Sequence, residues 1–385
     1  APDAARRVAG DVCGMPPDTM LADVAPPMAP TVGPHAGPVT SPAPRTIPPR
    51  PHPPLRAGRI GVLLLNLGTP SGTGYFAIRR YLSEFLQDRR IVELPRVVWW
   101  PILQAAILST RPFSKRREYR AIWNTTRDES PLLTTTRATA DGVRARVAGW
   151  SDALLVDFGM RYGTPSTRSR IEALARAGCD RILAVPLYPQ YSATTVASSC
   201  DAVFDALKTL RWQPALRVAT PWYDRPAYID ALAASWHAHV ASLPAEPEVL
   251  VASFHGIPKK SFAKGDPYYC HCMKTGRLLQ RALGLPDDRF RVTFQSRFGP
   301  AEWLQPYTDV TIRDLATTGT RRIAVIAPGF AADCLETIEE LGVTARDDFL
   351  AHGGTQFSLV PCLNDSPAAI DVLESVLAHE LAGWL

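Results

Sequence analysis

The sequence lacks the features that would place it outside the ordinary globular classes. Its seven cysteines are spaced irregularly over 385 residues, which is not typical of a secreted disulfide framework and favours a reducing compartment. No apolar run is long enough for a transmembrane helix, and the longest, residues 97–108, is interrupted by Pro101 and Gln104. The formal net charge is only +5, with no block of basic residues and interleaved aromatics, so nucleic-acid binding is not indicated.

Residues 1–57 lack apolar periodicity and hold 15 of the 36 prolines. A segment of this composition cannot bury enough apolar surface to offset its ordering entropy. It also lacks the charged and continuous apolar regions of a signal peptide, and it is not rich in Arg and Ser as a transit peptide would be. We therefore predict a disordered, Pro-rich N-terminal segment, with the folded part beginning near residue 58.

Six short apolar runs after residue 58 are rich in β-branched residues and are typical of buried strands. Most are followed by a helical pattern, and this alternation predicts parallel sheets joined by right-handed crossovers. Because the alternation occurs twice, we predict an α/β protein with two doubly wound Rossmann-like lobes, 58–235 and 236–385, and a cleft between them. The second lobe is expected to end in a packing helix. The predicted strands lie within residues 59–70, 153–166, 180–192, 248–258, 289–300 and 321–330.

Three carboxylates follow the last of these strands. If a helix begins near Asp333, then Asp333, Glu336 and Glu340 fall at i, i+3 and i+7 and share one helix face. They form either a ligand site at the carboxyl end of a strand or a solvated acidic first turn that complements the helix dipole. His255, at the end of another predicted strand, is either a structural histidine or a member of the same site.

Several sequence blocks resemble ferrochelatases and occur in the order typical of that family. The resemblance runs from about residue 58 to the C-terminus, and it looks closest to the protoporphyrin group of Gram-negative bacteria. The matching blocks are LLNLGTP, GMRYGTPS, PLYPQYSATT, SFHGIP, GDPYYCHC, FQSRFGPAEWLQPYTD and PGFAADCLETIEE.

This resemblance implies a lyase that inserts Fe(II) into protoporphyrin IX to form protohaem. Two protons are released, and the reaction is the terminal step of haem biosynthesis. The alternatives are a coproporphyrin ferrochelatase or another tetrapyrrole chelatase. A non-catalytic porphyrin or haem carrier is a further alternative, against which the presence of both His255 and Glu336 argues.

Metal insertion needs a group that accepts the pyrrole protons and a route for the iron. A neutral His suits proton acceptance near pH 7, and a His with a carboxylate and open positions suits Fe(II). We therefore expect His255 to be the proton acceptor or a metal ligand, and Glu336 to be a metal ligand or a proton relay. Glu340 and Asp333 are the next candidates for catalytic residues.

The resemblance also assigns residues to porphyrin binding. Arg161 and Tyr162 match the family's pair on the face of the ring opposite to the catalytic His. The remaining matches are the pocket positions Leu67, Tyr119, Trp303 and Phe330, and the candidates for the porphyrin carboxylates, Arg111, Ser130 and Ser296. A purely structural role is the alternative for each of these last three.

Residues 91–113 carry a series of apolar side chains that includes Trp99, Trp100 and Ile102. They form either a core helix or an exposed apolar lip that touches a membrane surface. In ferrochelatases this region is the lip of the porphyrin pocket. The resemblance therefore implies a cytoplasmic protein with peripheral contact at the inner membrane and transient contact with the preceding enzyme of the haem pathway.

We expect no cofactor beyond the substrates Fe(II) and protoporphyrin IX. Animal ferrochelatases hold a 2Fe-2S cluster on one mid-chain Cys and three C-terminal ones. Here Ala193 stands at the mid-chain position and no C-terminal cysteine tail is present. Cys270 and Cys272 alone do not complete the four-ligand set of such a cluster.

Overall fold

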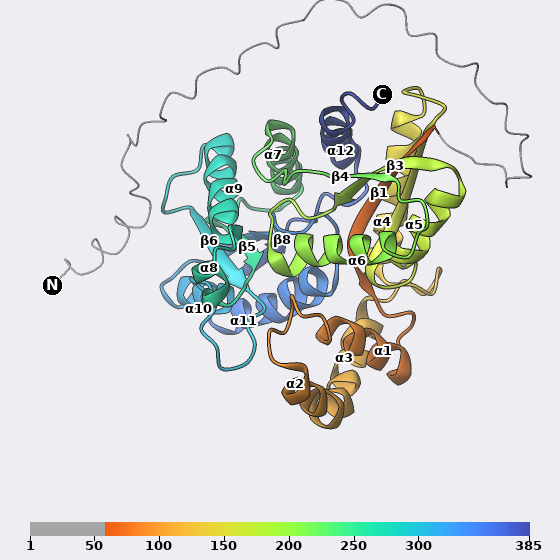
Figure 1. Ribbon diagram of the computed structural model, residues 1–385. Helices are drawn as coiled ribbons and strands as arrows, with labels where there is room; N and C mark the ends of the chain where they lie inside the picture. The colour runs from red at the N-terminus through yellow and green to blue at the C-terminus, as the bar shows by residue number, and fades with distance from the viewer. Residues whose placement is uncertain (1–57) are drawn as a thin grey trace, which may run out of the picture. The chain divides into compact units, whose positions relative to one another are not determined.

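Two four-stranded parallel sheets form the framework of residues 58–385, which are the residues that the computed structural model describes (Figure 1). The prediction of a disordered segment over residues 1–57 lies outside the described residues. The prediction of two parallel α/β lobes is confirmed. The domain boundary expected after residue 235 falls inside α7 (Pro226–Ala241), which continues unbroken across it.

The first sheet has the strand order β2-β1-β3-β4, with every pair parallel. Its inner strand β1 is a continuous apolar run in which Val62 to Leu65 are fully buried, as expected for a parallel strand that is covered on both faces. Val62 and Leu64 belong to one buried cluster, and the alternate residues Leu63 and Leu65 belong to another. The strands are β1 (Arg59–Thr69), β2 (Leu154–Gly163), β3 (Cys179–Pro186) and β4 (Ala215–Val218).

Helices cover both faces of the first sheet. Buried side chains of α4 share the cluster of Val62 and Leu64, whereas α5 and α6 share the cluster of Leu63 and Leu65. The residues after β3 form a short π-helical segment followed by an α-helix. The elements are α4 (Pro131–Val147), α5 (Thr167–Arg176), the π-helical η2 (Ala193–Ala197) and α6 (Ser198–Leu207).

The second sheet has the strand order β6-β5-β7-β8, again all parallel. Its strands are β5 (Val249–His255), β6 (Phe290–Gln295), β7 (Arg322–Ile326) and β8 (Gln356–Leu359). The short outer strands β4 and β8 were not among the six predicted strands. The helices are α8 (Lys259–Ala263), α9 (Tyr268–Leu283), α10 (Thr308–Thr317), η3 (Glu336–Ala345), α11 (Arg346–Ala351) and α12 (Pro367–Glu380).

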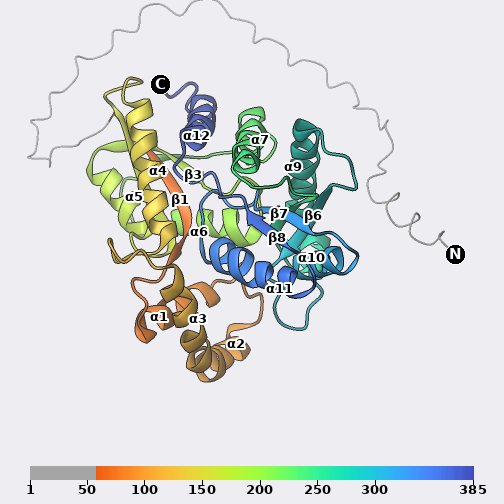
Figure 2. The same cartoon turned by 180° about the vertical axis from the view of Figure 1, so that it is seen from behind.

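One buried cluster runs through both halves of the described chain. It joins Leu64 of the first sheet and Ala252 of the second to buried residues of α7, α9 and α12. These three helices lie next to one another along one side of the molecule, as seen from both faces (Figures 1 and 2). The final helix was predicted from its sequence, and Ser366 caps it by accepting a hydrogen bond from the Ala369 amide.

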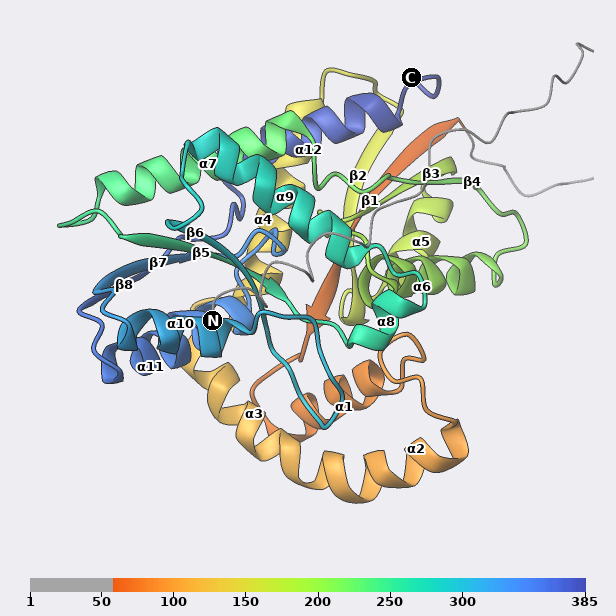
Figure 3. The same ribbon diagram turned by 90° about the vertical axis from the view of Figure 1, so that its left-hand side faces the viewer.

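The chain between β1 and α4 forms a separate group of helices, which we call the lip segment (residues 75–122). It lies at one end of the molecule in Figures 1 and 3. Trp100 is 57% exposed and Val97 is 84% exposed, whereas Trp99 is 8% exposed and donates its indole N–H to the Leu86 carbonyl. The segment comprises α1 (Tyr75–Leu86), α2 (Arg96–Ile102), the π-helical η1 (Leu103–Ile107) and α3 (Leu108–Ile122).

The helix that carries the predicted acidic ladder differs from the expectation. It is π-helical over Glu336–Ala345, and Asp333 lies before its start. The expectation that Asp333 shares a helix face with Glu336 and Glu340 is therefore wrong.

Within residues 58–385, no helix has both the length and the apolar character needed to cross a membrane.

Candidate active site

His255 ends β5 and lies in register with Gln295 at the end of β6. The next residue, Gly256, donates its N–H to the Gln295 carbonyl at 2.8 Å. A Cβ on Gly256 would lie 2.8 Å from that oxygen and 3.2 Å from the Trp303 ring, so only glycine permits this close approach. The half-buried His255 side chain is thus held where two parallel strands end, the usual place for ligand sites in α/β sheets.

The tautomer of His255 follows from its neighbour. Nδ1 lies 2.6 Å from the carbonyl oxygen of Gly256, and because a carbonyl oxygen only accepts, Nδ1 must donate. Neutral His255 therefore carries its lone pair on Nε2. The ring centroid of Phe330 lies 6.4 Å from that of His255, which places an aromatic face beside the imidazole.

The end of β6 connects His255 to the π-helix η3. Gln295 is buried; it donates its amide to the Glu336 carbonyl at 3.0 Å and accepts a hydrogen bond from Ser253 at 2.7 Å. Ser296 has a positive φ of 65°, uncommon for a residue with a Cβ, and its hydroxyl donates to the Glu340 carboxylate at 2.6 Å. The end of β6 therefore contacts η3 at two points, the Glu336 main-chain carbonyl and the Glu340 carboxylate.

Glu336, Glu340 and His255 act on one another electrostatically. Burial raises the pKa of Glu340, and the charge of Glu336 raises it further, whereas the Ser296 hydroxyl and His255 oppose the rise. Burial is also the main reason that the pKa of Tyr119 is raised, and the Glu336 carboxylate adds to that shift. The Glu336 carboxylate thus influences both Glu340 and the buried Tyr119 of the lip segment.

Asp333 is occupied by structural hydrogen bonds. Its carboxylate accepts from the Thr337 hydroxyl at 2.9 Å and from the Asn364 amide at 2.7 Å. It therefore ties the chain before η3 to the loop that leads into α12, and it does not join Glu336 and Glu340.

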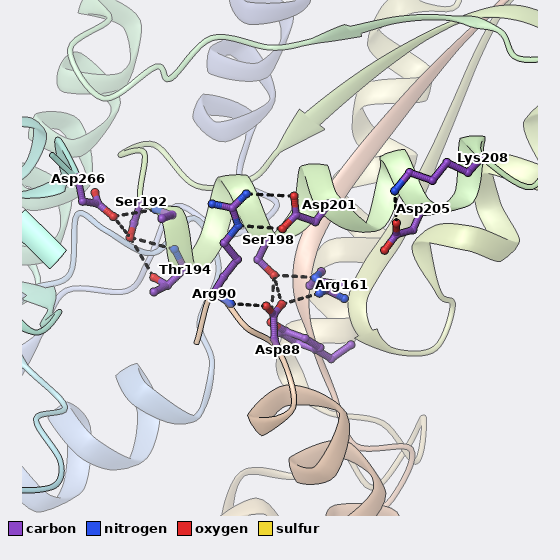
Figure 4. Close-up of polar contacts among 12 residues, drawn as sticks. Asp88, Arg90, Arg161, Ser192, Thr194, Ser198, Asp201, Asp205, Lys208 and Asp266 are labelled. Atoms are coloured by element: carbon purple, nitrogen blue, oxygen red, sulfur yellow. Dashed lines mark hydrogen bonds and ion pairs between the residues drawn. The ribbon is translucent and has the colours of Figure 1, made fainter. Parts of the chain in front are cut away.

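Arg161 and Tyr162 lie at the end of β2. Gly68 at the neighbouring end of β1 has a φ of +106°, and a Cβ there would lie 1.8 Å from the Tyr162 carbonyl oxygen, so this contact requires glycine. Tyr162 is 1% exposed and donates its hydroxyl to Asp88 at 2.7 Å. Arg161 donates to Ser198 at 2.7 Å and forms an ion pair with Asp88 (Figure 4).

Burial, followed by the charge of Asp88, raises the pKa of Tyr162, although Arg161 and Ser198 oppose the shift. Tyr162 therefore stays a neutral phenol that donates a hydrogen bond. It belongs to a buried apolar cluster with Tyr119 and Leu335, against which Leu67 packs. Through Leu335, this cluster reaches the start of η3.

The other predicted residues divide into two groups. Trp303 is buried and donates its indole N–H to the Phe298 carbonyl at 3.0 Å, and the Arg111 guanidinium lies 5.7 Å from the centroid of the Phe298 ring. Both therefore border the loop that follows Ser296. Ser130 is 2% exposed, and its hydroxyl accepts from the Leu133 amide as the N-cap of α4, so this hydroxyl already has a structural role.

Sequence reasoning missed three residues that the structure brings to the site. Asp88 binds Arg161 and Tyr162 directly. Burial raises the pKa of Tyr188, which also responds to the nearby charge of Arg161 and to Cys334, and burial together with Tyr119 and Glu336 raises the pKa of Tyr81. Tyr188 was detectable, because it lies just after the end of β3 within the third predicted strand region, and His255 lies at the end of β5 within the fourth. Asp88 and Tyr81 do not lie near the end of a predicted strand, so the sequence did not indicate them.

In residues 58–385, no three His, Cys, Asp or Glu side chains are grouped so that they would together hold a metal ion. The described cysteines are all free thiols. Cys270 is exposed, whereas Cys272 is fully buried in the cluster that joins the two halves.

The fold is shared with chelatases. The structure of SirB from Bacillus subtilis with Fe3+ superimposes with a TM-score of 0.52, covering 85% of this chain and 97% of SirB at 11% sequence identity. This likeness shows that the two chains share a fold.

Comparisons of the sequence identify the family to which the chain belongs. The ferrochelatase profile matches residues 59–381. The ferrochelatase of Rhizobium meliloti (strain 1021) is 56% identical over 87% of this chain and 98% of its own length, and that of Agrobacterium fabrum (strain C58 / ATCC 33970) is 53% identical over 88% and 98%. The chain belongs to the ferrochelatase family. It is a lyase that inserts Fe(II) into porphyrin in haem synthesis.

Proposed function

We propose that this ferrochelatase uses protoporphyrin IX and forms protohaem in the terminal step of haem synthesis. The observation that supports this most is the grouping of His255, Glu336 and Glu340 at the ends of two strands and the start of a π-helix. The resemblance of these blocks to the protoporphyrin enzymes of Gram-negative bacteria supports the choice of porphyrin.

His255 accepts the pyrrole protons through Nε2. This role is supported by the hydrogen bond at Nδ1, which fixes the ring and leaves the other nitrogen as the acceptor. Before it takes a proton, the same Nε2 lone pair and Glu336 hold the substrate Fe(II) briefly with open positions, a ligand set that suits this ion. Glu340, held by Ser296, passes protons onward. Asp333 serves by positioning the chain before η3.

The porphyrin ring contacts Leu67, Tyr119, Trp303 and Phe330, with Arg161 and Tyr162 on the face opposite His255. Tyr162 is a hydrogen-bond donor in this site, because its pKa is raised mainly by burial. Arg111 borders the loop that follows Ser296 and is the better candidate for the porphyrin carboxylates, whereas the Ser296 hydroxyl is already held by Glu340. Ser130, whose hydroxyl caps α4, is the weaker one.

We further propose that the chain works in the cytoplasm with peripheral contact at the inner membrane. The lip segment holds 7 of the 14 exposed large hydrophobic side chains of the described residues. It also carries 10 Lys or Arg and 4 Asp or Glu, a net +6, against +5 for the whole chain. Exposed apolar side chains with basic neighbours favour an anionic lipid surface. Transient contact with the preceding pathway enzyme is proposed at the same segment.

No resident cofactor is needed for this reaction, and we do not propose a 2Fe-2S cluster. The burial of Cys272 in the core and the exposure of Cys270 support this, because neighbouring cluster ligands must converge on one site.

The deciding experiment is a side-by-side assay of anaerobic Fe(II) insertion into protoporphyrin IX and coproporphyrin. We expect a clear preference in kcat/KM for protoporphyrin IX. A higher kcat/KM for coproporphyrin would identify coproporphyrin as the substrate instead of protoporphyrin IX. Porphyrin binding without insertion of any metal would support the carrier alternative.

A further inference from the structure

We propose that Asp88 is a positioning residue that holds Arg161 and Tyr162 in place and couples the lip segment to them. This inference rests on the proposed contact of Arg161 and Tyr162 with the porphyrin. Asp88 lies in the turn between α1 and α2, and its side chain is 5% exposed. No substrate contact is assigned to it.

The Asp88 carboxylate receives four hydrogen bonds from three segments of the chain. Tyr162 at 2.7 Å, Arg161 and Ser198 all donate to Oδ2. The Arg90 backbone N–H donates to Oδ1 at 2.7 Å. The donors thus come from the end of β2, from the start of α6 and from the turn itself (Figure 4).

The turn is fixed at a second point. The Asp88 carbonyl accepts from the Val92 amide at 2.9 Å, and the Arg90 guanidinium forms two hydrogen bonds to Asp201, at 2.8 and 3.2 Å. Ser198 and Asp201 are three residues apart on α6 and therefore lie on one helix face. Two points near the start of the turn, Asp88 and Arg90, are therefore held by that face.

The negative charge of Asp88 balances the positive charge of Arg161. Burial by itself raises the pKa of Asp88, but Ser198, the Arg90 N–H, Tyr162 and Arg161 together hold that pKa below its ordinary value. Asp88 is therefore ionised, and it neutralises Arg161. A carboxylate that accepts several charge-assisted hydrogen bonds fixes its donors strongly, and removing it would leave a buried Arg161 without its counter-charge.

The orientation of the porphyrin-binding pair depends on this carboxylate. The Arg161 guanidinium lies 4.5 Å from the centroid of the Tyr162 ring, and the Tyr162 ring packs edge-on against Phe85 of α1 at 5.1 Å. Phe85 lies three residues before Asp88 in the chain. A displacement of the lip segment would thus move the packing partner of Tyr162 and the shared acceptor of both side chains together.

The test measures protoporphyrin affinity by fluorescence quenching and Fe(II) insertion by single turnover in Asp88→Asn. We expect the porphyrin Kd to rise about tenfold or more, as for a lost charge-assisted hydrogen bond. The matched control is Asp205→Asn, which breaks only the exposed pair with Lys208 on the same helix and should leave Kd within about twofold. Arg161→Ala should weaken binding, and the Asp88→Asn/Arg161→Ala double variant should be little worse than the worse single variant.

A normal Kd for folded Asp88→Asn, or fully additive losses in the double variant, would overturn the proposal. If Asp88→Asn does not fold, Ser198→Ala gives the same test, since it removes one donor and leaves Asp88 with three. A normal porphyrin Kd in Ser198→Ala would also count against the proposal. Wild-type insertion in the same assay reports separately on the proposed function, because porphyrin binding is measured without turnover.

Discussion

The Ser296 hydroxyl donates a hydrogen bond of 2.6 Å to the Glu340 carboxylate and so joins the end of β6 to the π-helix η3. Ser296 was expected from the family resemblance to bind a porphyrin carboxylate, but here its hydroxyl is engaged by a catalytic candidate. The contact explains why a non-glycine residue adopts a positive φ at this position: the hydrogen bond offsets the strain of that conformation.

Ser296→Ala should therefore affect turnover more than binding. Loss of the hydrogen bond frees Glu340 and should lower kcat about threefold to tenfold, as expected for loss of roughly 1 kcal/mol of positioning. The KM for porphyrin should stay near the wild-type value. A raised KM with an unchanged kcat would instead assign Ser296 to the porphyrin carboxylate.

Gly256→Ala should disturb both stability and catalysis. The added Cβ would meet the Gln295 carbonyl at 2.8 Å, so the ends of β5 and β6 must separate, at a cost of about 1–3 kcal/mol. Urea unfolding and single-turnover insertion measure the two effects. Gly149→Ala is the matched control, because a Cβ there meets nothing within 4 Å. Equal behaviour of the two variants would contradict the close approach.

Trp100→Ser should weaken binding to vesicles that contain anionic lipid and should raise the KM for membrane-dissolved porphyrin. Trp212→Ser is the control, because Trp212 is similarly exposed, 51% against 57%, but lies outside the lip segment. The measurement is vesicle co-sedimentation with and without anionic lipid. Equal losses in both variants would remove the argument for a specific membrane face.

Asp88→Asn should destabilise the fold by a nearly constant amount between about pH 5 and pH 8. A carboxyl group whose folded-state pKa is lowered contributes stability above its unfolded pKa of 3.8, and this is lost only as the pH falls through the folded value. We expect a loss of about 2–4 kcal/mol from breaking a buried pair. Urea unfolding at several pH values measures it, and a difference that changes strongly within that range would point to another titrating group.

Much of the framework could be predicted because parallel strands such as β1 and β5 are continuous apolar runs. The end of the β5 run also indicated His255, whereas Arg161, near the end of β2, was assigned through the family resemblance. The π-helix was not predictable, because Glu336 and Glu340 fit an α-helical spacing equally well in the sequence. The displacement of Asp333 from the ladder follows from its bonds to Thr337 and Asn364, and the second of these depends on tertiary structure.

Asp88 shows the clearest limit of sequence reasoning. It lies 73 residues from Arg161 and 110 residues from Ser198, in a turn without periodicity. A single acidic residue in such a turn is usually solvated. Its role became visible only when the fold brought three segments together around one carboxylate.

The central claim is that His255 and Glu336 act together in metal insertion. Single-turnover Fe(II) insertion into protoporphyrin IX by His255→Ala and Glu336→Gln tests it, with porphyrin affinity measured by fluorescence quenching. The controls are His352→Ala, an exposed histidine, and Glu339→Gln, a neighbouring carboxylate on η3 that accepts from Thr344.

We predict a loss in the insertion rate of about 10²–10⁴-fold for His255→Ala, as expected for loss of a general base, and a strong loss for Glu336→Gln. Porphyrin affinity should be nearly unchanged in both variants, and the double variant should be little worse than the worse single one. The two controls should insert iron at wild-type rates. Near-normal insertion by folded His255→Ala would contradict the account.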